Sequence, residues 1–273
     1  MTNLEKAFHK MKADIQIKTG PRMETINRRN SRRTVRNRTP EGYTVNVRNG
    51  RFIFDLGTSG AKVTVQDADA ADRHVLVNVQ TEITITTRNG DSRKEIQNEK
   101  WLCGHDERDW FVSGATGITI WEAKQNLKPA QVQAVEGAVP KKKVQKRKNS
   151  ARIRQGEWFF IPANDEVPTQ NIIIHNDEPM SRPGGGKPHI VEEVVRFGGR
   201  VVWAKGTSVI EDKDFLNLET SKQRGYVRRQ ADANVYGRGY VKHPDHETIL
   251  LEGWHKILMN TEKRNGKTLI FLD

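Results

Sequence analysis

The chain has 273 residues and a net charge of +12, from 46 Lys and Arg against 34 Asp and Glu. That length can hold two compact domains, although a hydrophobic content of 35% is low. A single cysteine, Cys103, excludes an intrachain disulfide and a cysteine-based zinc finger and fits a reducing compartment. No apolar run approaches the roughly 20 residues of a membrane helix, and the polar start lacks a signal-peptide core. These features predict a soluble cytoplasmic protein with no membrane partner.

Positive charge is concentrated in two segments. Residues 18–38 contain eight Lys and Arg against one acid, and residues 141–154 contain eight with no acid. Their combined +15 exceeds the charge of the whole chain, so all other residues together carry −3. Like charges at this density repel one another, whereas a polyphosphate releases condensed counterions when it binds them. The pattern therefore predicts nucleic acid as the partner.

An N-terminal amphipathic helix is predicted within residues 1–19, followed by a basic arm over residues 20–41. The arm lacks apolar periodicity and is expected to be irregular until it binds a partner. The helix prediction rests on apolar residues that recur every three or four positions, namely Leu4, Phe8, Met11 and Ile15.

A β-rich α+β domain is predicted over residues 42–138, because the hydrophobic period there changes to two and β-branched residues accumulate. Asn49-Gly50 and Asn89-Gly90 are strong hairpin turn signals. The pattern indicates a small antiparallel sheet or barrel followed by two short helices. Strands are expected at 43–47, 51–54, 62–65, 74–79, 82–86, 100–103 and 109–112, and helices at 120–127 and 129–135.

Residues 139–151 are lysine-rich without a hydrophobic face and are interpreted as a basic linker to a second α+β domain over residues 152–273. Pro188 suits the first turn of a helix over 188–197, and a second helix is expected over 211–224. The predicted fold class is α+β, with two domains rich in antiparallel β-sheet, a few short helices, and the N-terminal amphipathic helix and basic arm. Strands of the second domain are expected at 157–161, 171–174, 200–203, 239–242, 247–251 and 254–259.

The basic segments and nearby residues are the candidates for nucleic-acid binding. Arg can grip phosphate with two parallel hydrogen bonds, Lys acts as a mobile point charge, and exposed aromatic rings can stack on bases. Alternative interpretations are a solvated tail and spacer, or a nuclear-import signal at residues 140–144. The candidate residues are Arg28, Arg29, Arg32, Arg33, Arg36, Arg38, Lys141, Lys142, Lys143, Lys146, Arg147, Lys148, Arg152, Arg154, Lys187, Arg228, Arg229, Tyr226 and Tyr240.

Residues 182–189 (RPGGGKPH) offer either a phosphate contact through Lys187 and backbone amides or a flexible hinge. This is not a P-loop, because the spacing differs and Pro188 stands where Ser or Thr would bind magnesium.

The turn expected at residues 103–109 gathers Cys103, His105 and Asp106. A Cys–His pair can activate a thiolate, and acidic residues can hold a divalent cation. The alternative is an internal ion-pair turn with no chemistry.

A second candidate is the segment 243–246 (HPDH), because Pro-Asp favours a type I turn that brings its ends within about 7 Å. His243 and His246 could then face one ion, with His255 or neighbouring acids completing the site. The alternative is a histidine-flanked turn without a metal.

Residues 104–112 (GHDERDWFV) and 253–260 (GWHKILMN) resemble segments of uncharacterised bacterial proteins, and the resemblance implies a bacterial or phage setting.

These observations predict a nucleic-acid-binding protein, an accessory subunit of a ribonucleoprotein or mobile-element complex, with no cofactor and no metal; they do not decide whether it has an enzymatic activity. RNA is favoured slightly over DNA because no helix-turn-helix, zinc finger or basic zipper is readable. One alternative is a metal-dependent nuclease that uses a divalent metal at the histidine turn. Another is a capsid-like structural protein whose basic arm binds a genome.

Overall fold

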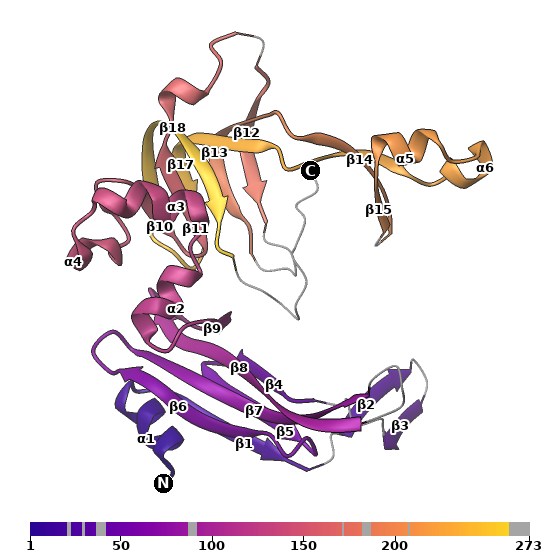
Figure 1. Ribbon diagram of the computed structural model, residues 1–273. Coiled ribbons are helices and arrows are strands. Elements are labelled where there is room, and N and C mark those ends of the chain that lie inside the picture. The colour runs from indigo at the N-terminus through magenta and orange to yellow at the C-terminus, as the bar shows by residue number, and fades with distance from the viewer. Residues whose placement is uncertain are drawn as a thin grey trace. The chain divides into compact units, whose positions relative to one another are not determined.

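The computed structural model describes residues 1–20, 23–28, 31–36, 42–86, 92–170, 172–181, 187–206 and 208–261; for 23–28, 31–36 and Thr86 it describes the backbone alone. The chain divides into two compact units, Met1–Leu127 and Lys128–Asp273 (Figure 1). Both are built mainly from antiparallel β-strands with a few short helices. Among the described residues, no helix has the length and apolar character needed to cross a lipid bilayer.

The first unit contains two sheets with strand orders β1-β5-β4 and β6-β7-β8-β9, and a separate β2–β3 pair. The β1–β5 pair is parallel, and the other pairs in this unit are antiparallel. The elements are α1 (Asn3–Lys10), β1 (Asp14–Thr19), β2 (Met23–Arg28), β3 (Ser31–Arg36), β4 (Thr44–Arg48), β5 (Arg51–Gly57), β6 (Lys62–Asp69), β7 (His74–Thr86), β8 (Ser92–Asp106), β9 (Asp109–Ala115) and α2 (Ile120–Asn126).

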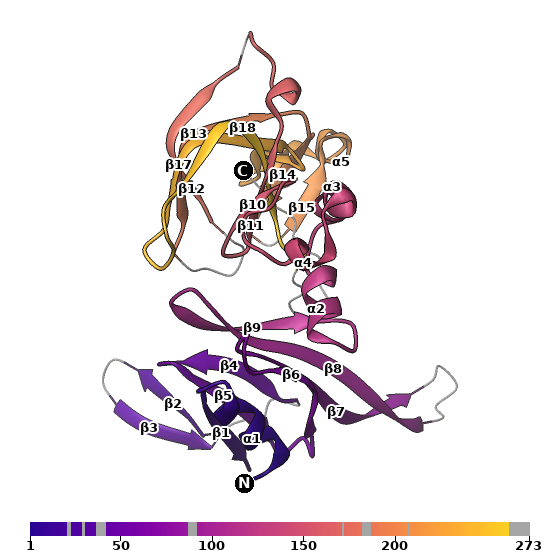
Figure 2. The ribbon, with the colours of Figure 1, turned by 90° about the vertical axis from the view of Figure 1, so that its left-hand side faces the viewer.

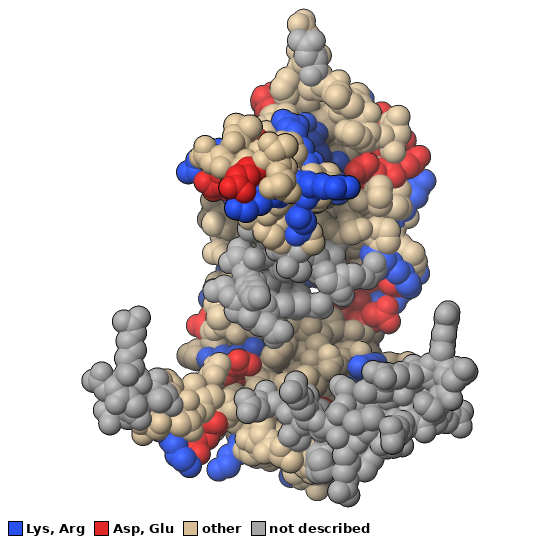
Figure 3. Space-filling model, turned by 90° about the vertical axis from the view of Figure 1, so that its right-hand side faces the viewer, with Lys and Arg blue, Asp and Glu red and all other residues tan. Residues whose placement is uncertain are grey.

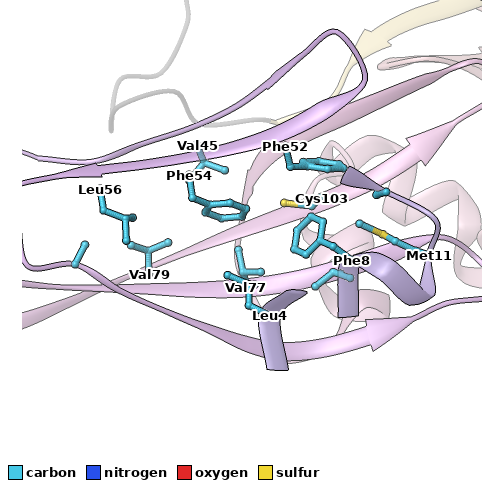
Figure 4. Close-up of a cluster of buried hydrophobic side chains, with 13 residues drawn as sticks. Leu4, Phe8, Met11, Val45, Phe52, Phe54, Leu56, Val77, Val79 and Cys103 are labelled. Atoms are coloured by element: carbon cyan, nitrogen blue, oxygen red, sulfur yellow. The ribbon is translucent and has the colours of Figure 1, made fainter. Parts of the chain in front are cut away.

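The main core of this unit lies between its two sheets and α1 (Figure 4). Alternate residues of β5, such as Phe52 and Phe54, are buried there, and the ring of Phe8 from α1 meets both edge-on. Because side chains alternate along a strand, β7 serves two cores at once. Val77 points into the main core, whereas Leu76 packs on the opposite face against α2.

The N-terminal helix is shorter than predicted. It ends at Lys10, and Lys12 adopts a positive φ of 60° that turns the chain into β1. Leu4 and Phe8 are buried on the helix as expected, but Ile15 lies on β1 opposite Phe52. The spacing of the four apolar residues therefore spans a helix, a turn and a strand.

The segment predicted as an irregular arm contains the antiparallel pair β2–β3, with Met23 opposite Arg36 and Arg28 opposite Ser31. β-Branched residues in both halves, such as Ile26 and Val35, favour the extended backbone. The prediction of irregular structure for these residues is therefore wrong.

The hairpin signal at Asn49-Gly50 is confirmed. Arg48 pairs with Arg51, and both turn residues have positive φ, 51° for Asn49 and 72° for Gly50. Such values are typical of a type I′ turn. Asn89-Gly90 lies outside the described residues, although β7 and β8 on either side of it pair antiparallel.

The second unit contains an antiparallel six-stranded sheet of order β10-β11-β18-β17-β13-β12 and a three-stranded sheet of order β15-β14-β16. Figure 1 shows the smaller sheet, with α5 and α6, extending away from the larger one, and Figure 2 shows the larger sheet from the side opposite to the smaller one, which lies behind it. The elements are α3 (Ala130–Val135), η1 (Glu136–Ala138), α4 (Lys141–Val144), β10 (Ile153–Gln155), β11 (Trp158–Pro162), η2 (Asn164–Glu166), β12 (Ile174–Met180), β13 (His189–Phe197), β14 (Arg200–Lys205), β15 (Ser208–Glu211), α5 (Asp212–Leu216), α6 (Thr220–Gln223), β16 (Val227–Ala231), β17 (Asn234–Lys242) and β18 (Ile249–Met259).

The helix predicted over 188–197 is wrong, because this segment is strand β13. An irregularity in its pairing with β17 lies between Val191 and Glu193. Such an extra residue shifts the alternation of side chains by one position. Val191 and Val194 are consequently buried in the same core. A spacing of three residues, which resembles one face of a helix, here results from a bulged strand.

Other boundaries also differ from the prediction. The strand expected at 171–174 begins only at Ile174, and the helix expected over 211–224 is split into α5 and α6. The strands expected at 74–79 and 82–86 form the single strand β7, and those expected at 247–251 and 254–259 form the single strand β18.

The lysine-rich segment predicted as a linker belongs to the second unit, since the division of the chain falls between Leu127 and Lys128. It forms the short helix α4, and Val144 at the end of that helix is buried. The description of this segment as lacking a hydrophobic face is therefore wrong.

Candidate cationic surface and histidine cluster

The basic segment 141–154 is held in place by a buried ion-pair network. Arg152 is 2% exposed, and its Nε donates to Oε1 of Glu136 at 2.7 Å. Lys128 Nζ lies 2.6 Å from the other oxygen of the same carboxylate. Arg152 also donates to the backbone carbonyls of Val144 and Arg147, both at 2.9 Å. Arg152 therefore fixes the path of the basic segment. The prediction that it contacts nucleic acid at the surface is wrong, because the side chain is buried against Glu136.

The charges of this network compensate one another. Burial raises the pKa of Glu136, but the hydrogen bond from Lys128 and the charge of Arg152 outweigh it and lower the pKa below its usual value. Asn149 adds a hydrogen bond from its amide nitrogen to Glu136 Oε1 at 3.0 Å. The carboxylate is thus satisfied by the cations at the base of the segment.

The lysines of the segment lie on its outer side. Lys141, Lys142, Lys143, Lys146 and Lys148 are exposed, whereas Arg147 and Arg154 are half-buried. Within the described part of the chain, the ammonium groups of Lys142, Lys143, Lys146 and Lys148 form no ion pair. The folded segment consequently presents uncompensated positive charge on an anchored backbone.

A second group of candidates lies on the smaller sheet. Arg228 and Arg229 are exposed on β16, and Tyr226 just before it packs edge-on against Phe215 with ring centroids 5.9 Å apart. Figure 3 looks onto the side of this unit from which the small sheet extends and shows Lys and Arg side chains gathered across it, with acidic groups to either side. Tyr240, on β17, is 48% exposed.

Several other candidates are less available. Lys187 is exposed but pairs with Asp245, its Nζ 2.6 Å from Oδ1. The three aromatic residues Trp158, Phe159 and Phe160, which follow Arg154 closely in the sequence, are all buried, so none of these rings faces a ligand. Arg29, Arg38 and the glycines of residues 182–186 lie outside the described residues. So do the side chains of Arg28, Arg32, Arg33 and Arg36, whose backbones form β2 and β3.

The turn at residues 103–109 does not assemble a nucleophile. Cys103 is completely buried in the core of the first unit, and burial raises the pKa of its thiol, which disfavours the thiolate. His105 packs edge-on against Trp110 with ring centroids 4.8 Å apart, and Asp106 is half-buried at the end of β8. Cys103 is a core residue, not part of a Cys–His pair at the surface.

The histidines of the segment 243–246 do come together, but with a partner that the sequence does not predict. His243 and His246 flank the turn between β17 and β18, and His189 at the start of β13 joins them. Potential ligand atoms of these three residues all lie within 4.8 Å of one another. His255 is buried on β18, where its Nδ1 lies 3.0 Å from the carbonyl oxygen of Gly253, and it does not join the group.

The imidazole ring of His189 stacks on those of His243 and His246, which are tilted against each other by 32°. The ring centroids of His189 and His243 are 4.2 Å apart, and those of His243 and His246 are 4.6 Å apart. His189 is 1% exposed, and the other two are half-buried. Burial and the neighbouring charge of His246 lower the pKa of His243, which favours the neutral imidazole.

The surrounding strands position the cluster. Ile190 pairs with Lys242, so continuing the antiparallel register by one residue places His189 opposite His243. Gln155, at the end of β10, donates from Nε2 to the carbonyl of Glu247 at 2.5 Å and ties the turn to the six-stranded sheet. Recognising β13 as the strand that pairs with β17 is the step that would have identified His189 from the sequence.

Comparison of this chain with models of known protein families, with curated proteins and with solved structures finds no match in any of the three.

Proposed function

We propose that this protein binds nucleic acid, with RNA as the preferred ligand, through the anchored cationic segment of its second unit. The observation that carries the proposal is the group of four exposed lysines, Lys142, Lys143, Lys146 and Lys148, which have no ion-pair partner among the described residues. Uncompensated cations at this spacing attract a phosphate backbone and release its counterions.

The anchoring supports the same role. Because Arg152 and Val144 hold the segment against the second unit, its lysines lose less backbone freedom on binding than those of an unfolded tail. The exposed Arg228 and Arg229 on β16 supply additional cations on the same unit.

The preference for RNA follows from the kind of secondary structure. Sequence-specific readers of duplex DNA commonly insert a helix into the major groove. The described helices of the second unit are six residues long or shorter. Strands that present Arg and Tyr side chains suit single-stranded or structured RNA, in which phosphates and unstacked bases are accessible. The proposed role is that of an accessory subunit in a ribonucleoprotein or mobile-element complex.

The test is a binding titration of the purified chain with labelled single-stranded RNA, DNA of the same sequence and duplex DNA over a range of salt concentrations. The key variant replaces Lys142, Lys143, Lys146 and Lys148 together by Gln. The salt slope is the decrease of log K with the logarithm of the salt concentration, and each phosphate contact with a single strand contributes about 0.7 to it. The variant lacks four cations, so its slope should be lower by about 3. We expect tighter binding of RNA than of either DNA.

The matched control replaces four exposed lysines of the first unit, Lys6, Lys10, Lys12 and Lys62, by Gln. It changes the net charge by the same amount, so an equal loss of affinity in both variants would indicate a nonspecific charge effect and overturn the proposal. Unchanged affinity and salt slope in the first variant would overturn it as well.

A further inference from the structure

We infer that His189, His243 and His246 form a binding site for a divalent transition-metal ion, with Zn²⁺ as the best fit, in the second unit. Their potential ligand atoms already lie within 4.8 Å of one another, although the residues come from β13 and from the turn between β17 and β18. This inference does not depend on nucleic-acid binding.

The ligand set selects the class of metal. Neutral imidazole nitrogen suits Zn²⁺, Co²⁺, Ni²⁺ and Cu²⁺, whereas Mg²⁺ and Ca²⁺ prefer carboxylate, carbonyl and water oxygens. The nearest carboxylate in the turn, Asp245, is engaged with Lys187 at 2.6 Å. Three histidines without an acidic ligand therefore point to a borderline-soft ion such as Zn²⁺.

The potential ligand atoms, which lie within 4.8 Å of one another, must move closer together to bind one ion. Nitrogen ligands at about 2.0–2.1 Å from a tetrahedral ion lie about 3.4 Å from one another. The planes of the three rings differ by only 24° to 32°, so rotation about their side-chain bonds must turn the nitrogens toward a common point. His243 and His246 are half-buried, so these two imidazoles are partly accessible to solvent.

The contacts of His243 are ones that an ion can replace. Its Nδ1 accepts a hydrogen bond from the backbone N–H of Asp245 at 3.1 Å, and its Nε2 lies 3.2 Å from the carbonyl oxygen of Lys187. Both contacts lie at the long end of hydrogen-bond distances.

Gly156 forms the wall of the site on the side of β10. It has a positive φ of 57°, and a Cβ at this position would lie 2.8 Å from His246 Nε2 and 3.4 Å from His189 Nε2. A side chain at Gly156 would therefore press on two of the three imidazoles, so the cluster requires glycine at this position.

Three protein ligands leave one position of a tetrahedral ion for water or another small ligand. Catalytic zinc sites commonly have this arrangement, whereas structural sites are closed by four protein ligands. Because His189 is buried and His243 and His246 are half-buried, we place the open position on the side of the turn. The site would thus accept a small exogenous anion.

The experiment uses the untagged full chain, stripped with a chelator and titrated with Co²⁺ and then Zn²⁺. We expect one equivalent of Co²⁺ to bind with the visible absorption of tetrahedral coordination, Zn²⁺ to displace it, and excess Mg²⁺ to leave it in place. Addition of azide should shift the spectrum, because azide enters the open position. No stoichiometric Co²⁺ binding, or displacement by Mg²⁺, overturns the inference; a spectrum insensitive to azide overturns the open position.

Variants identify the ligands. His189→Gln, His243→Gln and His246→Gln should each weaken Co²⁺ binding at least tenfold, and Gly156→Ala should weaken it by obstruction while keeping all three imidazoles. Two controls, His175→Gln on the exposed start of β12 and His255→Gln on β18, lie outside the cluster and should bind as the parent protein does. Circular dichroism of every variant separates loss of ligands from loss of fold. Parent-like binding by folded His189→Gln and His246→Gln variants contradicts the assignment.

Discussion

Arg152 and Glu136 form an ion pair that is almost fully buried, with Arg152 Nε 2.7 Å from Glu136 Oε1 and both side chains no more than 3% exposed. The pair connects the basic segment to η1, and through Lys128 it reaches the first residue of the second unit. A basic segment can therefore be part of a folded unit, because one of its cations is buried in an ion pair while the neighbouring cations are exposed to solvent.

We expect Arg152→Met to destabilise the second unit by about 3–5 kcal/mol, because it leaves Glu136 and Lys128 buried with an incomplete network. Denaturant unfolding monitored by circular dichroism measures the loss. Lys142→Met, on the exposed side of the same segment, should change the free energy of unfolding by no more than about 0.5 kcal/mol. Equal effects of the two substitutions would show that the buried pair does not anchor the segment.

The β-rich character of both units could be predicted from the sequence because it follows from local signals. Asn49-Gly50 specifies a tight hairpin, and the alternation of Val75, Val77 and Val79 places these three residues on one face of a strand. These signals need no knowledge of distant parts of the chain.

The predictions from the sequence fail where the structure of a segment depends on contacts with residues far away in the chain. Val191 and Val194 have a helical spacing, but a bulge in the pairing of β13 with β17 produces it. Arg152 looks like one more cation in a basic run, and only its contact with Glu136 makes it a core residue. Sequence reasoning identified the His243–His246 turn correctly but could not supply His189, because the register between two strands brings that residue to the turn.

The first unit should lose stability in mild acid through His74. Burial, and secondarily the charge of Lys124, lower the pKa of His74 from 6.5 to about 4. Between these values the unfolded chain binds a proton that the folded chain does not, so stability falls as the pH drops from about 6.5 toward 4. The slope is at most about 1.4 kcal/mol per pH unit.

The measurement is denaturant unfolding at several pH values between 7 and 4.5, for the parent chain and for His74→Gln. Carboxylates that titrate in this range contribute to both proteins, so the difference between the two slopes isolates His74. We expect the variant to be less dependent on pH. Parallel curves would mean that His74 is protonated in the folded state as readily as in the unfolded one.

Gly104 allows His74 and Phe111 to meet across three strands. It pairs with His74 on β7 and Phe111 on β9, and the two rings lie edge to face with centroids 5.7 Å apart. A Cβ on Gly104 would lie 2.7 Å from His74 Nε2 and 2.9 Å from Phe111 Cε1. Gly104→Ala should therefore destabilise the first unit by about 1–3 kcal/mol through overpacking. In a His74→Ala background the same change should cost less, and an additive double-mutant cycle would argue against this contact.

The two units should fold independently when they are expressed as residues 1–127 and 128–273. Each has its own buried clusters, with Phe8, Phe52 and Phe54 in the first and Trp158, Phe160 and Val194 in the second. A separate hydrophobic core is the main requirement for a domain to fold alone.

The boundary between the fragments matters, because Lys128 pairs with Glu136 and must stay with the second unit. We expect a cooperative unfolding transition for each fragment and loss of stability when the second fragment begins at residue 139, which removes both residues. A fragment 139–273 as stable as 128–273 would contradict the assignment of Glu136 to the interior of this unit.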